Sequence, residues 1–113
     1  MDEKMKDMEF LKLAKSTVAA YSNTLLEMVH EPEISEDDVH ISSFHKSLKN
    51  WKALLITKNH PKDGMYYEVT FDGDQSKLYL DAYKKFQNIA FAVNEFQHAD
   101  KPAEPVHKAP WNN

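Results

Sequence analysis

The chain has 113 residues, of which 42% are hydrophobic and 28% charged, and its 18 acidic and 14 basic side chains give a formal net charge of -4. This length supports one hydrophobic core without disulfides and is too short for a second independent core. The absence of cysteine excludes disulfides, thiolate metal sites and thiol catalysis. Every basic side chain is lysine, so the chain lacks arginine, the residue best suited to bidentate recognition of phosphate or guanine.

The first residues, MDEKMKDMEFLKLAK, are too charged for a signal peptide. No apolar run approaches the roughly 20 residues needed to span a bilayer. We therefore expect a cytoplasmic protein.

A helix is predicted over about residues 5–29, because apolar residues recur there at steps of three and four. The residues on this stripe are Met8, Leu11, Ala14, Val18, Tyr21, Leu25 and Met28. Pro32 prevents the helix from continuing, since it lacks an amide donor and its ring clashes with the preceding turn. An acidic connector follows at residues 31–38, EPEISEDD, which contains five carboxylates and no lysine.

Three strands are predicted next, each from the alternation of side chains on two faces. They cover residues 39–44, residues 51–57 with the apolar run WKALLIT, and residues 65–72 with the run MYYEVTFD. Polar or turn-forming residues separate them, including Pro61, Asp63 and Gly64 before the third strand.

Helical spacing returns at Tyr79 and predicts a second helix that is already running by Asp81 and reaches Phe96. Residues 77–80 fit a short fourth strand as an alternative, with Asp81 then capping the helix. The prolines of residues 100–113 predict a flexible tail after a single globular domain at residues 1–99.

These elements predict an α+β fold of order αβββα, in which two helices cover one face of a three-stranded antiparallel sheet. The other sheet face would then carry a mixture of aromatic and polar side chains: His40, Ser42, Phe44, Tyr66, Glu68 and Thr70. Such a face is either a binding surface, for which we select His40, Phe44, Tyr66 and Glu68, or an ordinary solvated surface.

The stretch GMYYEVTFDGDQSKLYLDAYKKFQN, residues 64–88, resembles a family of small, mostly uncharacterised proteins encoded by phages and prophages of Gram-positive bacteria. The resemblance reaches back through KALLIT and FLKLAK and carries no catalytic signature. It implies a genomic setting in which small accessory proteins often block host machinery, including CRISPR effector nucleases, inside the bacterial host cell.

Acidic residues gather at the end of the first helix and in the connector: Glu27, Glu31, Glu33, Glu36, Asp37 and Asp38. Carboxylates at this density can imitate the phosphates of a nucleic acid and bind a basic surface on another protein. A solubilising loop is the alternative interpretation.

Five lysines between residues 46 and 62, with Lys77, Lys84 and Lys85, raise the alternative of a small nucleic-acid-binding module. The acidic net charge and the lack of arginine argue against direct duplex binding.

A structural zinc site is a further alternative, because His30 and His98 each lie at the predicted end of a helix and Asp100 follows closely. Stabilisation of a protonated histidine by the helix dipole explains these positions without a metal.

Catalysis has little support, since a set drawn from Asp37, His40, Ser42 and His45 is only a chance proximity in sequence.

The sequence thus predicts a non-enzymatic inhibitor without a cofactor, which binds a host defence protein such as a CRISPR effector nuclease. It would block nucleic-acid loading or a required domain motion. The predicted contact surfaces are the acidic connector, with Glu31, Glu33, Glu36, Asp37 and Asp38, and the uncovered sheet face.

Overall fold

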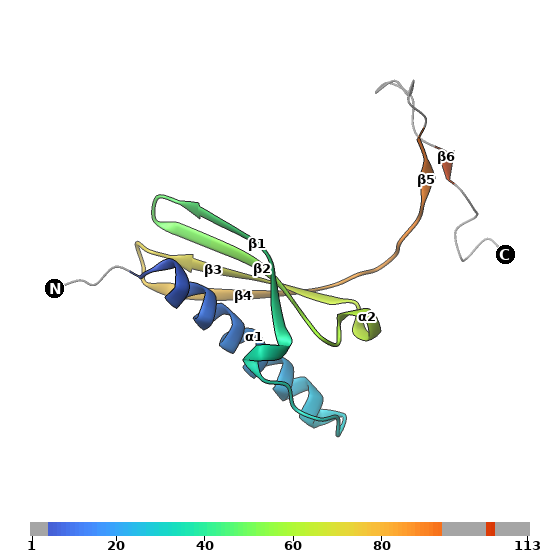
Figure 1. Cartoon of the computed structure of the whole chain (residues 1–113), viewed down its shortest axis with the longest axis horizontal. Helices are drawn as coiled ribbons and strands as arrows, with labels where there is room; N and C mark the ends of the chain where they lie inside the picture. The colour runs from blue at the N-terminus through green and yellow to red at the C-terminus, as the bar shows by residue number, and fades with distance from the viewer. Residues whose placement is uncertain (1–4, 94–103, 106–113) are drawn as a thin grey trace.

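A computed structural model describes residues 5–93 and 104–105 of the chain. Helix α1 (Asp7–Met28) lies across one face of an antiparallel sheet of four strands. The strands are β1 (Val39–Ser47), β2 (Asn50–Thr57), β3 (Met65–Asp72) and β4 (Lys77–Lys84), and each pairs with the next along the chain (Figure 1).

Shorter elements join or follow these. A 3₁₀ turn η1 (Glu36–Asp38) leads into β1, and a four-residue helix α2 (His60–Asp63) connects β2 to β3. After β4 the chain runs away from the sheet and forms β5 (Phe91–Ala92), which pairs with β6 (Glu104–Pro105) (Figure 1). Neither α1 nor α2 is long and apolar enough to cross a membrane, and no other α-helix occurs in the described part of the chain.

The α+β class and the antiparallel sheet are confirmed, whereas the three-stranded sheet and the second long helix are wrong. Residues 77–84 form β4, and Asp81 lies in the middle of that strand opposite Glu68. Pairing with β3 decides this outcome, because eight paired positions satisfy the backbone groups of β3 that face β4. The alternative of a fourth strand is therefore correct for residues 77–80, but the strand continues to Lys84, so Asp81 does not cap a helix.

The predicted first helix is confirmed. Part of its apolar stripe, at Leu11, Ala14, Val18 and Tyr21, packs with the sheet in the core, whereas Met8, Leu25 and Met28 are exposed. Phe10 is fully buried and contacts the rings of Phe44 and Trp51, with centroids 5.6 and 5.7 Å away. Small buried side chains at Ala14 and Val18 let the helix approach the strands closely. Burial of each large apolar side chain contributes roughly 1.5–3 kcal/mol relative to exposure.

A β-bulge in β1 changes which side chains of this strand face the helix. The pairing passes from Ile41 with Leu55 to Ser43 with Leu54, which leaves Ser42 as the extra residue. Phe44 is therefore turned toward α1, where it stacks on Phe10. The prediction that Phe44 lies on the uncovered face is wrong for this reason.

The connector between α1 and β1 is held against the helix by one asparagine. The Asn23 side-chain carbonyl accepts a hydrogen bond from the Ile34 amide (2.8 Å), and its amide group donates to the Ile34 carbonyl (2.9 Å). Ile34 itself is buried in the core. The acidic connector thus has a fixed path along the helix.

Candidate binding surface on the open face of the sheet

The face of the sheet opposite α1 is the most distinctive surface of the molecule. Within residues 5–93 no second long helix exists to cover it. The side chains that alternate with the core positions lie there, including Leu54 and Ile56 of β2, which are only half-buried. We call this surface the open face.

Strand pairing arranges the open face in rows that run across the sheet. The central row joins Ser43, Leu54, Glu68 and Asp81. The row on one side of it joins His45, Lys52, Thr70 and Tyr79. On its other side lie two pairs, His40 with Ile56 and Tyr66 with Tyr83. Hydrophobic, aromatic and charged side chains therefore alternate across one continuous surface.

Three tyrosines give the open face most of its aromatic area. Tyr66, Tyr79 and Tyr83 are 39%, 46% and 41% exposed. The rings of Tyr66 and Tyr83 stack with centroids 5.1 Å apart and planes 17° from parallel. Partial burial and the negative charges of Asp81 and Glu68 raise the pKa of the Tyr83 hydroxyl.

The structure places His40, Tyr66, Glu68 and Thr70 on the open face, as predicted. It adds residues that the sequence interpretation missed: Leu54, Ile56, Tyr79, Asp81 and Tyr83. The three from β4 were assigned to a helix, and the two from β2 lie in a run that is apolar on both faces.

The acidic connector is largely paired with lysines. Lys12 Nζ lies 2.7 Å from Glu36, Lys58 Nζ 3.8 Å from Asp38, and Lys62 Nζ 3.7 Å from Glu31. A hydrogen bond from the Ser35 amide and the positive charge of Lys58 lower the pKa of Asp38. Within residues 5–93, Glu33 and Asp37 are the connector carboxylates that make no ion pair, so the connector is a weaker anionic surface than its sequence suggests.

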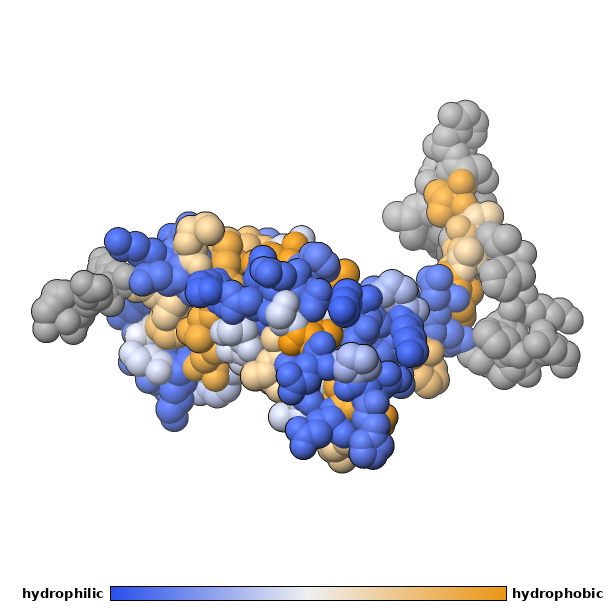
Figure 2. All heavy atoms as spheres, turned by 60° about the horizontal axis from the view of Figure 1, so that its bottom comes forward, coloured by the Kyte–Doolittle hydropathy of each residue, from blue (hydrophilic) through white to orange (hydrophobic). Residues whose placement is uncertain are grey.

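The lysines between residues 46 and 62 are paired in the same way. Besides the pairs of Lys58 and Lys62, Lys46 contacts Asp7 (2.9 Å), Lys49 contacts Asp74 (3.0 Å) and Lys52 contacts Glu68 (3.6 Å). Charges that are segregated in the sequence thus alternate in space. Figure 2 shows one face on which hydrophilic residues predominate and hydrophobic residues form patches between them.

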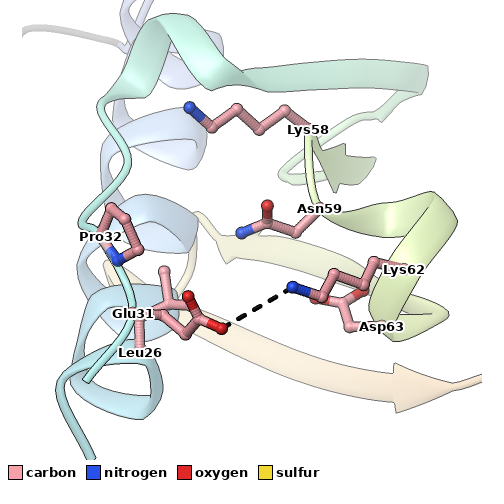
Figure 3. A pocket seen from close by; sticks show the side chains of 7 residues that line it. All are labelled: Leu26, Glu31, Pro32, Lys58, Asn59, Lys62 and Asp63. Carbon is pink, nitrogen blue, oxygen red and sulfur yellow. Dashed lines mark ion pairs between the residues drawn. The ribbon is translucent and has the colours of Figure 1, made fainter. Parts of the chain in front are cut away.

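A hollow of about 360 Å³ lies between the end of α1 and the loop that carries α2. Figure 3 shows Glu31 and Lys62 reaching toward each other across it, with Leu26 and Pro32 on the same side as Glu31. Bonds from the Met65 amide to Asp63 (2.8 Å) and between His60 Nδ1 and the Met65 carbonyl (2.7 Å) fix the loop. The lining residues are Leu26, Glu31, Pro32, Lys58, Asn59, Lys62 and Asp63.

The predicted zinc site lies only partly within the described residues. His98 and Asp100 of the predicted zinc site lie outside the described residues, and His30 is exposed. In the described part of the chain, no three His, Asp or Glu side chains gather closely enough to hold a metal ion.

The β-bulge at Ser42 brings both His40 and His45 to the open face. Their partners Ile56 and Lys52 are four residues apart, about 13 Å along the strand, so the two rings cannot share an ion.

Comparison with known proteins identifies a family without identifying an activity. No curated protein and no solved structure matches the chain. A family model described as "Family of unknown function (DUF6275)" matches residues 11–93. The match runs from the second turn of α1 through the whole sheet and the segment after it. The chain therefore belongs to the family of unknown function DUF6275.

Proposed function

We propose that the protein is a non-enzymatic binding protein and that the open face is its contact surface. The observation that carries this proposal is the group of three partly exposed tyrosines beside Leu54 and Ile56 on a sheet face that no described helix covers. Tyrosine and other aromatic side chains supply much of the energy of protein interfaces. A solvated sheet face would be expected to carry mostly charged and small polar residues.

The biological role that we propose is inhibition of a host defence complex, such as a CRISPR effector nuclease, by a phage- or prophage-encoded protein. The resemblance of residues 64–88 to such proteins supports this setting. Binding of the open face would occlude a nucleic-acid channel or restrain a domain that must move.

The acidic connector is the second surface considered for this role. Three of its five carboxylates already neutralise lysines of the same chain, which lowers the field that they present to a partner. We therefore assign the principal contact to the open face rather than to the connector.

The test is a plasmid-interference assay in a bacterium that carries a CRISPR effector nuclease and expresses the protein. We expect the wild-type protein to restore transformation by a targeted plasmid, and the double variant Tyr79→Ala/Tyr83→Ala to lose at least 90% of this effect, roughly tenfold. Far-UV circular dichroism should show that the variant is folded.

Two control variants separate the surfaces. Met8→Ala/Leu13→Ala removes comparable exposed apolar area from α1 and should retain the effect. Glu33→Lys/Asp37→Lys reverses the charge of two connector carboxylates and leaves the ion pairs of the other three in place. If this variant loses inhibition while the tyrosine variant keeps it, the connector is the interface and the open face is not.

A further inference from the structure

The row of the open face that contains Glu68 and Asp81 has an unusual charge arrangement. These two carboxylates are direct partners across β3 and β4, a position in which like charges destabilise a sheet. One lysine forms an ion pair with one of these carboxylates, since Lys52 Nζ lies 3.6 Å from Glu68. Within residues 5–93, Asp81 makes no ion pair.

Aromatic rings border this carboxylate pair on both sides. The stacked Tyr66 and Tyr83 lie one row away in one direction, and Tyr79 lies one row away in the other. Partial burial, followed by the negative charges of Asp81 and Glu68, raises the pKa of the Tyr83 hydroxyl. Two carboxylates between tyrosine rings are complementary to a planar cation, which stacks on the rings and bonds the oxygens.

Among residues 5–93, Lys52 lies beside this pair but already contacts Glu68, and Lys77 lies four positions, about 13 Å, from Asp81 along β4. Lys84, the nearest lysine along β4, is paired with Met65 and therefore lies on the helix side of the sheet. An arginine at this position must therefore come from another molecule, because the chain contains none.

We propose that the open face binds an arginine-bearing segment of a partner protein, with the guanidinium held by Glu68 and Asp81 between the tyrosine rings. Arginine fits better than lysine because its planar group bonds two carboxylate oxygens and stacks on aromatic faces at once. This inference rests on the proposed function, since it specifies the chemistry of the partner at the same surface.

The experiment titrates the ¹⁵N-labelled full chain with the peptide acetyl-GRGRGRG-amide and follows the amide shifts by NMR. We expect shifts concentrated at residues 66–70 and 79–83. The affinity should fall about tenfold in Asp81→Asn, which leaves the Lys52–Glu68 pair intact, and further in Glu68→Gln/Asp81→Asn. The corresponding lysine peptide should bind several-fold more weakly, and the uncharged citrulline peptide should not bind.

The matched control is Glu33→Gln/Asp37→Asn, which changes the net charge by the same amount as the double variant but lies in the connector. It should bind the arginine peptide like the wild type. Equal affinity of the wild type and Asp81→Asn, or shifts that map to the connector, would overturn the proposal. A dimer in sedimentation that dissociates in Asp81→Asn would also overturn it, because a second copy supplies only lysine.

The interference assay separates this proposal from the proposed function. If Tyr79→Ala/Tyr83→Ala loses inhibition and Asp81→Asn retains it, the open face is the interface and the arginine is not recognised there. If both variants retain inhibition, the proposed function itself fails. Loss of inhibition in both variants, together with the peptide result, supports both.

Discussion

Trp51 lies at the centre of the aromatic part of the core. Its ring contacts Phe10, Phe44 and Phe71 with centroids 5.7, 6.4 and 6.2 Å away, all in edge-on geometry. Lys46 Nζ lies 4.7 Å from the same ring. Since Phe10 is the helix residue in this group, it joins α1 to the sheet.

Replacement of Phe10 by alanine should therefore be among the most damaging single changes. We expect Phe10→Ala to lower the free energy of unfolding by about 3–5 kcal/mol, because it leaves a cavity under the helix. Met8→Ala, at an exposed position of the same helix, should change it by less than about 0.5 kcal/mol. Urea unfolding followed by far-UV circular dichroism measures both, and equal effects would contradict this account of the core.

Among the elements, α1 ends in a specific hydrogen-bond pattern at His30. The His30 amide donates to the Glu27 carbonyl (3.2 Å) and the Glu31 amide to the Leu26 carbonyl (2.9 Å), which is a Schellman motif. His30 occupies the left-handed position of this motif with φ 59°. Glycine is favoured at this position because a side chain there adds strain.

We expect His30→Gly to raise the free energy of unfolding by about 0.5–1 kcal/mol and to increase the melting temperature by a few degrees. Met28→Gly, two residues earlier in the last helical turn, should have the opposite sign, with a loss of about 0.5–1 kcal/mol. Thermal unfolding of the two variants checks the pair. A lower melting temperature for His30→Gly would show that the histidine side chain itself stabilises the helix end.

The elements differ in how far the sequence determines them. The stripe from Met8 to Met28 has one period over many turns, so α1 is predictable. Residues 77–84 satisfy two periods at once: Leu78 and Leu80 alternate as in a strand, while Tyr79 and Tyr83 are spaced as in a helix. Only the partner strand β3 resolves this ambiguity, and it is a tertiary contact.

The same limit applies to the candidate surface. His40 and Tyr66 could be placed on the open face because regular alternation holds around them. Phe44 could not be placed correctly, because nothing in the local sequence indicates the bulge at Ser42. Asp81 and Tyr83 reach this face only once β4 exists.

At the scale of the whole molecule, the charge pattern is a network of ion pairs between distant segments. Each lysine between residues 46 and 62 lies within 4 Å of a carboxylate. Exposed ion pairs contribute little stability individually, but they cancel the field that a lysine-rich surface would otherwise have. Nucleic-acid binding requires several unpaired cations that neutralise phosphates together.

We therefore expect no retardation of duplex DNA or RNA in gel-shift experiments with the wild-type protein at 50 mM salt and concentrations up to about 10 µM. The variant Asp7→Asn/Asp74→Asn releases Lys46 and Lys49, so it should bind duplexes weakly and lose that binding at 200 mM salt. Salt-dependent binding by the wild type would instead support a nucleic-acid-binding module.

The pairing of each strand with its successor also determines the order in which the molecule can form during synthesis. The sheet can grow hairpin by hairpin as the strands leave the ribosome. Helix α1 emerges first, yet its partners Trp51, Val69 and Phe71 follow some 40 to 60 positions after Phe10. At roughly 5–20 residues per second, its apolar stripe stays uncovered for several seconds, which is the interval in which a nascent chain is exposed to chaperones and to aggregation.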